Sequence, residues 1–83
     1  MEIIVTVCDK QKSFQYDFEV PILQSIETLT NDIVEVLKEV NVFLEIKHPL
    51  FYVPRLKRVL NRAETLGQAG VWNGDCLVIV EHG

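Results

Sequence analysis

The chain has 83 residues, of which 48% are hydrophobic and 24% charged. These are ordinary values for a globular protein, and they exclude a disordered tail, a low-complexity linker and a collagen-like rod. A chain of this length has room for one thin hydrophobic core, so we expect a single domain over residues 1–83. A thin core offers no deep, enclosed cavity, which argues against an elaborate enzyme.

The charge balance restricts the classes of partner. Eight Lys and Arg against twelve Asp and Glu give a formal net charge of -4, which argues against general binding to nucleic acid or to anionic lipid. Apolar runs such as Ile3-Ile4-Val5 are far shorter than the ~18 residues needed to cross a bilayer, and the first residues lack the pattern of a secretory signal. We therefore expect a cytoplasmic protein with no membrane insertion.

Two strands open the predicted fold. Residues 1–8 alternate in character and are rich in β-branched side chains, as in a half-buried strand. Residues 14–20 alternate aromatic or aliphatic side chains with polar ones, and the polar stretch between the two segments predicts a hairpin. Pro21 ends the second strand because it cannot donate a ladder hydrogen bond.

A helix is expected next, starting near Ile26 with Ser25 as its N-cap, and Asn41 is its natural stop because Asn tolerates a left-handed conformation. Apolar residues recur at spacings of three and four, which predicts one buried helix face. The residues expected on that face are Ile26, Leu29, Ile33, Val36 or Leu37, and Val40.

The rest of the chain alternates strands and turns. Residues 50–53 predict a third strand, 58–60 a short fourth one, and 65–71 a compact turn with a short 3₁₀ piece. Asn73-Gly74-Asp75 is a strong turn signal before a final strand at 77–80. The connection 42–49 stays open, since its apolar residues Phe43, Leu44 and Ile46 either extend the helix or pack beneath it. The predicted order is β-β-α-β-β-β.

Several segments resemble ubiquitin. Residues 1–7 resemble its opening strand, 25–29 the start of its helix, and 65–71 the Thr-Leu-x-x-x-x-Ile turn of that superfamily. The segment Gly70-Val71-Trp72-Asn73-Gly74-Asp75-Cys76-Leu77-Val78-Ile79 is similar to the end of YukD proteins, small cytosolic proteins that accompany bacterial type VII secretion. The resemblance implies an α+β, ubiquitin-like β-grasp fold, in which a mixed sheet of four to five strands carries one helix on one face. It also implies a non-catalytic adaptor that needs no cofactor and binds a protein partner, a secretion-system component among the candidates.

A covalent carrier or modifier is the rival function. Such proteins are joined to sulfur or lysine through a flexible tail with two glycines, whereas here Glu81-His82-Gly83 follows the final strand. Catalysis by other means has no motif to support it, because Ser13 and Ser25 lack a nucleophile elbow. Cys8 and Cys76 lack the spacing of a zinc site and are expected to be free thiols.

A protein-binding surface is predicted on the sheet face turned away from the helix. If Val5, Val7 and Leu77 face the helix, the pleat places Ile4, Val78 and Val80 on the opposite face, where a solvated sheet should be polar. A basic turn containing Arg55, Lys57 and Arg58 would form a charged rim against an acidic partner. The alternatives are scattered surface aliphatics, a solvated loop, and a face covered by a second copy of the chain in a weak homodimer rather than a monomer.

The first prediction concerns the rival function. When the protein is incubated with ATP and a lysate of its source cell, we expect no higher-mass adduct that depends on Gly83, because a bulky His precedes this single glycine. Immunoblotting of the full chain beside a variant without Gly83 measures this. Adducts that vanish with Gly83 would favour the carrier.

Overall fold

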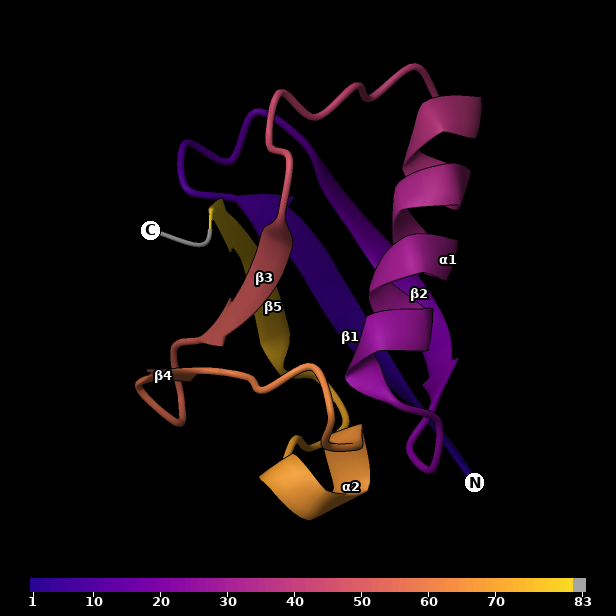
Figure 1. The fold of residues 1–83 in the computed structure, drawn as a ribbon, viewed down its shortest axis with the longest axis vertical. Coiled ribbons are helices and arrows are strands. Elements are labelled where there is room, and N and C mark those ends of the chain that lie inside the picture. Colours follow the sequence, from indigo (N-terminus) through magenta and orange to yellow (C-terminus); the bar gives the residue numbers. More distant parts are fainter. Residues whose placement is uncertain (82–83) are drawn as a thin grey trace.

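A computed structural model describes residues 1–81, and the prediction for the tail at Gly83 lies outside these residues. Residues 1–81 contain five strands and two helices (Figure 1). In chain order they are β1 (Glu2–Asp9), β2 (Gln15–Pro21), α1 (Ile26–Glu39), β3 (Pro49–Val53), β4 (Arg58–Val59), α2 (Leu66–Ala69) and β5 (Cys76–Glu81). Apart from the four-residue α2, this is the predicted order.

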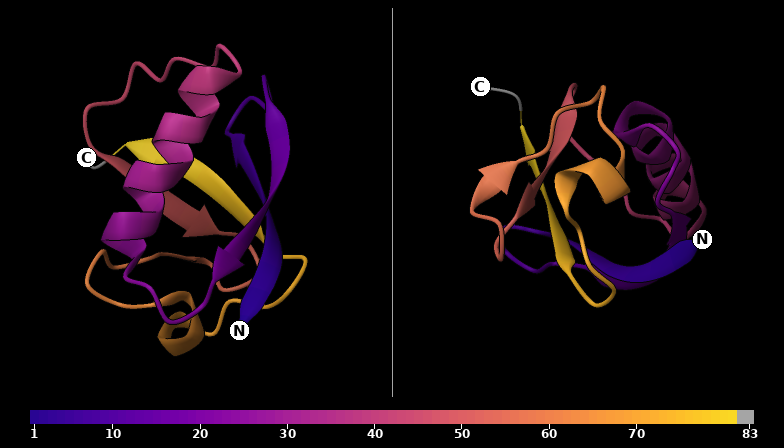
Figure 2. Two further views of the ribbon diagram at one scale, coloured as in Figure 1. Left: turned by 90° about the vertical axis from the view of Figure 1, so that its right-hand side faces the viewer. Right: turned by 90° about the horizontal axis from the view of Figure 1, so that it is seen from below.

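The strands form one mixed sheet in the order β2-β1-β5-β3-β4. β1 and β5 pair in parallel at its centre, and the other neighbouring pairs are antiparallel. α1 crosses one face of this sheet, and α2 lies at one end of the molecule (Figure 2). The expected α+β arrangement is therefore confirmed.

The ends of α1 follow local chemistry. The Ser25 side chain accepts a hydrogen bond from the backbone N–H of Thr28, and Asn41 ends the helix in the left-handed region with φ of 62°. The sequence left open whether Val36 or Leu37 lies on the buried face of α1. The structure places Leu37 there, fully buried, whereas Val36 and Val40 are each 43% exposed. Val40 was therefore wrongly assigned to the buried face, because it caps the helix instead of continuing it.

The segment 65–71 contains one turn of α-helix rather than the expected 3₁₀ piece. Its N-cap Thr65 and Gln68 form a capping box, in which the side chain of each residue accepts a hydrogen bond from the backbone N–H of the other. Gly70 ends α2 with φ of 83°, a conformation that favours glycine. The N–H of Gly67 donates to the carbonyl of Ile22 at 3.0 Å, which fixes α2 against the loop before α1.

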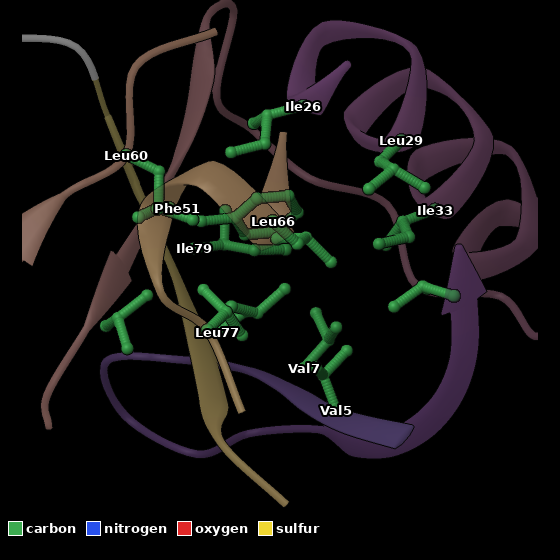
Figure 3. Packing of buried hydrophobic residues seen from close by; sticks show 14 of the residues in the cluster. Val5, Val7, Ile26, Leu29, Ile33, Phe51, Leu60, Leu66, Leu77 and Ile79 are labelled. Carbon is green, nitrogen blue, oxygen red and sulfur yellow. The ribbon is translucent and has the colours of Figure 1, made fainter. Parts of the chain in front are cut away.

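The core lies between the sheet and α1, and side chains from both layers point into this space (Figure 3). Every second residue of the strands contributes a side chain to the core from the sheet, and residues three or four apart in α1 contribute side chains from the helix. Its members, all under 9% exposed, are Val5, Val7, Val20, Ile26, Leu29, Ile33, Leu37, Phe51, Val53, Leu60, Leu66, Ala69, Val71, Leu77 and Ile79.

The open question about the connection 42–49 is also settled. It does not extend α1, and its alternate residues Val42, Leu44 and Ile46 are partly buried against the core. Phe43 points away and is 70% exposed. The segment therefore packs as an extended chain beside the helix.

The fold yields a matched pair of substitutions in α1. Leu37→Ala should lower the free energy of unfolding by about 2–5 kcal/mol, because it leaves a cavity at a fully buried position. Val36→Ala, one residue away and 43% exposed, should change it by less than about 0.5 kcal/mol. Chemical denaturation measures both, and equal losses would contradict the packing described.

Candidate interaction surface

The strand registers define the sheet face turned away from α1, here called the open face. Residues directly opposite each other in a ladder share a face, so the pairs extend across the sheet from β2 to β4. The central row runs Gln15, Cys8, Val78, Tyr52, Val59. One adjacent row holds Asp17, Thr6 and Cys76, and the other joins Val80 to Leu50.

Part of this face is a shallow apolar depression. It is lined by Lys10, Tyr52, Pro54, Val59, Val78 and Val80. Val59 is 42% exposed, and Tyr52, Val78 and Val80 are half-buried. The depression therefore offers a contiguous carbon surface to whatever binds the sheet.

The predicted apolar residues separate into two places. Val78 and Val80 line the depression, whereas Ile4, 46% exposed, lies at the far end of β1. There its N–H donates to the Asn73 side chain at 2.8 Å, and its carbonyl accepts from Gly74 N–H at 2.7 Å. Four residues separate Ile4 from the row of Val78, about 13 Å along the strand, so one small patch does not include all three.

Sequence reasoning missed Tyr52 and Val59, which complete the depression. Both belong to the row of Val78, Tyr52 through the pairing of β3 with β5 and Val59 through that of β4 with β3. The alternation of residues 50–53 carried a signal for Tyr52, because Phe51 and Val53 are the buried pair. The two-residue strand β4 is too short to show such a pattern.

The two cysteines are free thiols in unlike surroundings. Both lie on the open face, but Cys8 is 3% exposed whereas Cys76 is exposed. Burial, and secondly the nearby Cys76, raises the pKa of the Cys8 thiol. Both are free, as expected, but Cys8 should react slowly in the folded protein, since only the thiolate is nucleophilic and Cys8 is shielded.

Arg55, predicted to be a rim residue, instead joins two turns of the molecule. Its Nε donates to Asp75 Oδ1 at 2.9 Å and its Nη2 to Oδ2 at 2.8 Å, and it also donates to the Gly70 carbonyl. The guanidinium stacks on the indole of Trp72, 3.9 Å from the ring centroid. Asp75 also accepts from the N–H of Trp72 at 2.7 Å, so the turn before β5 closes around this carboxylate.

Arg58 is held in a similar way. Its two terminal nitrogens donate to the Glu64 carboxylate at 2.9 and 3.1 Å. Lys57 is exposed in the turn between β3 and β4, with φ of 54°. Because intramolecular carboxylates already neutralise Arg55 and Arg58, the positive charge of this turn is smaller than the sequence suggests.

These ion pairs shift the carboxylates' titration. The Arg55 guanidinium lowers the pKa of Asp75 against the opposing effect of burial, and Arg58 does the same for Glu64. At the other edge of the open face, the neighbouring Glu2 carboxyl raises the pKa of Glu19.

Within residues 1–81, no three His, Cys, Asp or Glu side chains are grouped so as to hold a metal ion. In the same residues, no helix has the length and apolar character needed to cross a membrane.

Comparison with known families decides which family this chain represents. The family model for the WXG100 protein secretion system (Wss) protein YukD matches residues 3–79. The chain belongs to the YukD family. No curated protein sequence matches it.

Several solved structures share the fold of this YukD-family chain. The ubiquitin-like domain of the Mycobacterium tuberculosis type VII secretion system protein EccD1 is 25% identical with a TM-score of 0.77, over 98% of this chain and 99% of that one. Caldiarchaeum subterraneum ubiquitin is 17% identical with a TM-score of 0.76, over 100% and 96%. A chain of a MycP5-free ESX-5 inner membrane complex is 17% identical with a TM-score of 0.71, over 99% of this chain and 22% of that one. The ubiquitin-like β-grasp fold is thereby confirmed.

The Asp75 cluster yields a pH-dependent prediction. Asp75→Ala should lower the free energy of unfolding at pH 7 by about 1–3 kcal/mol, because donors on Arg55 and Trp72 lose their acceptor. A lowered folded-state pKa stabilises the protein above the unfolded-state pKa of about 4, and this contribution is lost as the pH falls through the folded-state value. Denaturation from pH 7 to pH 2 should therefore show the two proteins converging in acid. Asp32→Ala, at an exposed helix position, is the control.

Proposed function

We propose that this YukD-family protein is a non-catalytic module that binds another protein through its open sheet face. The proposed setting is a type VII secretion system of a bacterium, with the module in the cytoplasm and without a cofactor. One observation carries the proposal. The apolar depression lies on a sheet face that α1 does not cover, where a solvated sheet is ordinarily polar.

The chemistry of the depression suits contact with a protein. Five of its six lining residues present mainly carbon, and Lys10 supplies a cation at its border. Protein interfaces are commonly built from such an apolar centre inside a polar rim. An acid–base enzyme would instead need titratable groups converging on one point.

The comparisons support the setting. The family description names a protein secretion system, and one structural relative is a domain of a type VII secretion protein. Another is a chain of an inner membrane complex, of which the similar part makes up 22%. A fold that recurs among proteins of secretion systems fits a role in their assembly.

Val78→Asp tests the proposal, because it places a charge at the centre of the depression. It should reduce partner capture from the source cell at least about tenfold while the protein still melts cooperatively, as truncating a central anchor costs over about 1–2 kcal/mol of binding. Val59→Asp, at a 42% exposed position of the same row, is a second variant that perturbs folding less. Crosslinked pull-down and thermal melting measure the two effects.

Val36→Asp is the control, since it adds the same charge at an exposed position on the opposite side of the sheet. A dimer of the wild type that becomes monomeric with Val78→Asp, by light scattering, would assign the face to a second copy of the chain. If neither partner capture nor oligomeric state changes with both open-face variants, the depression is ordinary surface and the proposal fails.

A further inference from the structure

The open face has two halves of different character. The half formed by β5, β3 and β4 is apolar and contains the depression. The half formed by β1 and β2 carries three exposed carboxylates on the same face. These residues, here called the acidic strip, are Glu2, Asp17 and Glu19.

The register places Asp17 nearest the depression, whereas Glu19, opposite Ile4, lies about 13 Å along the strands from the row of Val78, and Glu2 lies further along β1. Asp17 is opposite Thr6, whose hydroxyl donates to it at 2.7 Å, and Thr6 is in turn opposite Cys76, the residue next to the row of Val78. Two strand spacings, about 10 Å, therefore separate β2, which carries Asp17 and Glu19, from β5. This is about the diameter of an α-helix with its side chains.

The strip's charge is not neutralised by the part of the chain that the structure describes. The ion pairs within residues 1–81 join Lys38 to Glu35, Arg55 to Asp75 and Arg58 to Glu64, and the strip takes no part in them. The neighbouring Glu2 carboxyl raises the pKa of Glu19, first through side-chain hydrogen bonding and then through the repulsion of like charges. A cation placed between them would relieve this repulsion.

We propose that the occupant of the open face is a segment of another protein with an apolar side flanked by lysine or arginine. The apolar side would contact Tyr52, Val78 and Val80, and the cationic flank would face the acidic strip. This inference rests on the proposed function and adds the partner's chemistry to it. It also reverses the expectation of an acidic partner, because Arg55 and Arg58 already bind carboxylates of this chain.

Charge argues against the other occupants. A second copy would bring its own acidic strip to the interface, and the chain has a net charge of -4. An anionic membrane would be repelled by the same carboxylates. Electrostatic complementarity instead favours a cationic partner, both in the rate of encounter and in the orientation of the complex.

Two synthetic amphipathic peptides test this chemistry on the full chain. Both form helices with one leucine side, and the other positions are lysine in the first peptide and glutamate in the second. The lysine peptide should bind, slow the alkylation of the exposed Cys76, and bind more weakly as salt is raised from 0.05 to 0.3 M, roughly threefold or more, by screening. Stronger binding of the glutamate peptide, or binding of the lysine peptide without protection of Cys76, would overturn the inference.

Two charge reversals distinguish binding at the acidic strip from a general attraction to the net charge of the protein. Glu19→Lys and Glu39→Lys change the net charge equally at exposed glutamates, the first in the acidic strip and the second at the end of α1. Glu19→Lys should weaken binding of the lysine peptide by about threefold to tenfold, whereas Glu39→Lys should change it by less than about twofold. Equal effects would mean attraction to net charge alone and would overturn the inference.

Capture of the natural partner by the same variants distinguishes the proposed function, binding through the open face, from the further inference that the partner has a cationic flank. If Val78→Asp abolishes capture but Glu19→Lys leaves it unchanged, the open face binds a partner and the inferred cationic flank is wrong. If Val78→Asp and Val59→Asp both leave capture unchanged, the proposed function itself fails. Loss of capture with Val78→Asp and weakening with Glu19→Lys but not Glu39→Lys supports both.

Discussion

The parallel pairing of β1 with β5 at the centre of the sheet is the constraint on which the rest of this structure depends. Parallel neighbours cannot be joined by a tight turn, so the whole chain from β2 to α2 must leave β1 and return. This pairing aligns Val7 with Leu77 on the helix side and Cys8 with Val78 on the other. A slip of one residue would exchange the two faces, so the core and the candidate binding surface are fixed by the same register.

Much of the fold could be predicted because its signals are local. Strand alternation at residues 1–8, the Ser25 cap and the Asn41 stop each act over a few residues, and the structure contains them nearly as expected. The Asn73-Gly74 turn also forms, and its polar groups continue the pairing of Ile4. Local signals of this kind can be recognised in the sequence without knowledge of tertiary contacts.

The candidate site was harder to predict because it depends on contacts between distant residues. Arg55 is twenty residues from Asp75 in the chain, so the sequence presents a basic turn where the fold contains an ion pair. Cys8 occupies an outward-facing strand position and is nevertheless buried, which alternation alone cannot indicate. Val59 joins the depression only through a two-residue strand. In each case the pattern gives the residue type and the direction of its side chain, while the tertiary fold decides what surrounds it.

The central position of β5 has a consequence for the order of events during translation. The β1–β2 hairpin and α1 contain short-range contacts that can form as soon as residues 1–39 are outside the ribosome. β3 and β4, in contrast, reach the sheet only through β5, which is synthesised after both of them. Until β5 has been synthesised, the backbone N–H and C=O groups on the inner edge of β1 have no strand partner and can pair with other chains. The nascent protein can therefore complete its sheet only after β5 has been synthesised, and the non-local character of this pairing is expected to slow it.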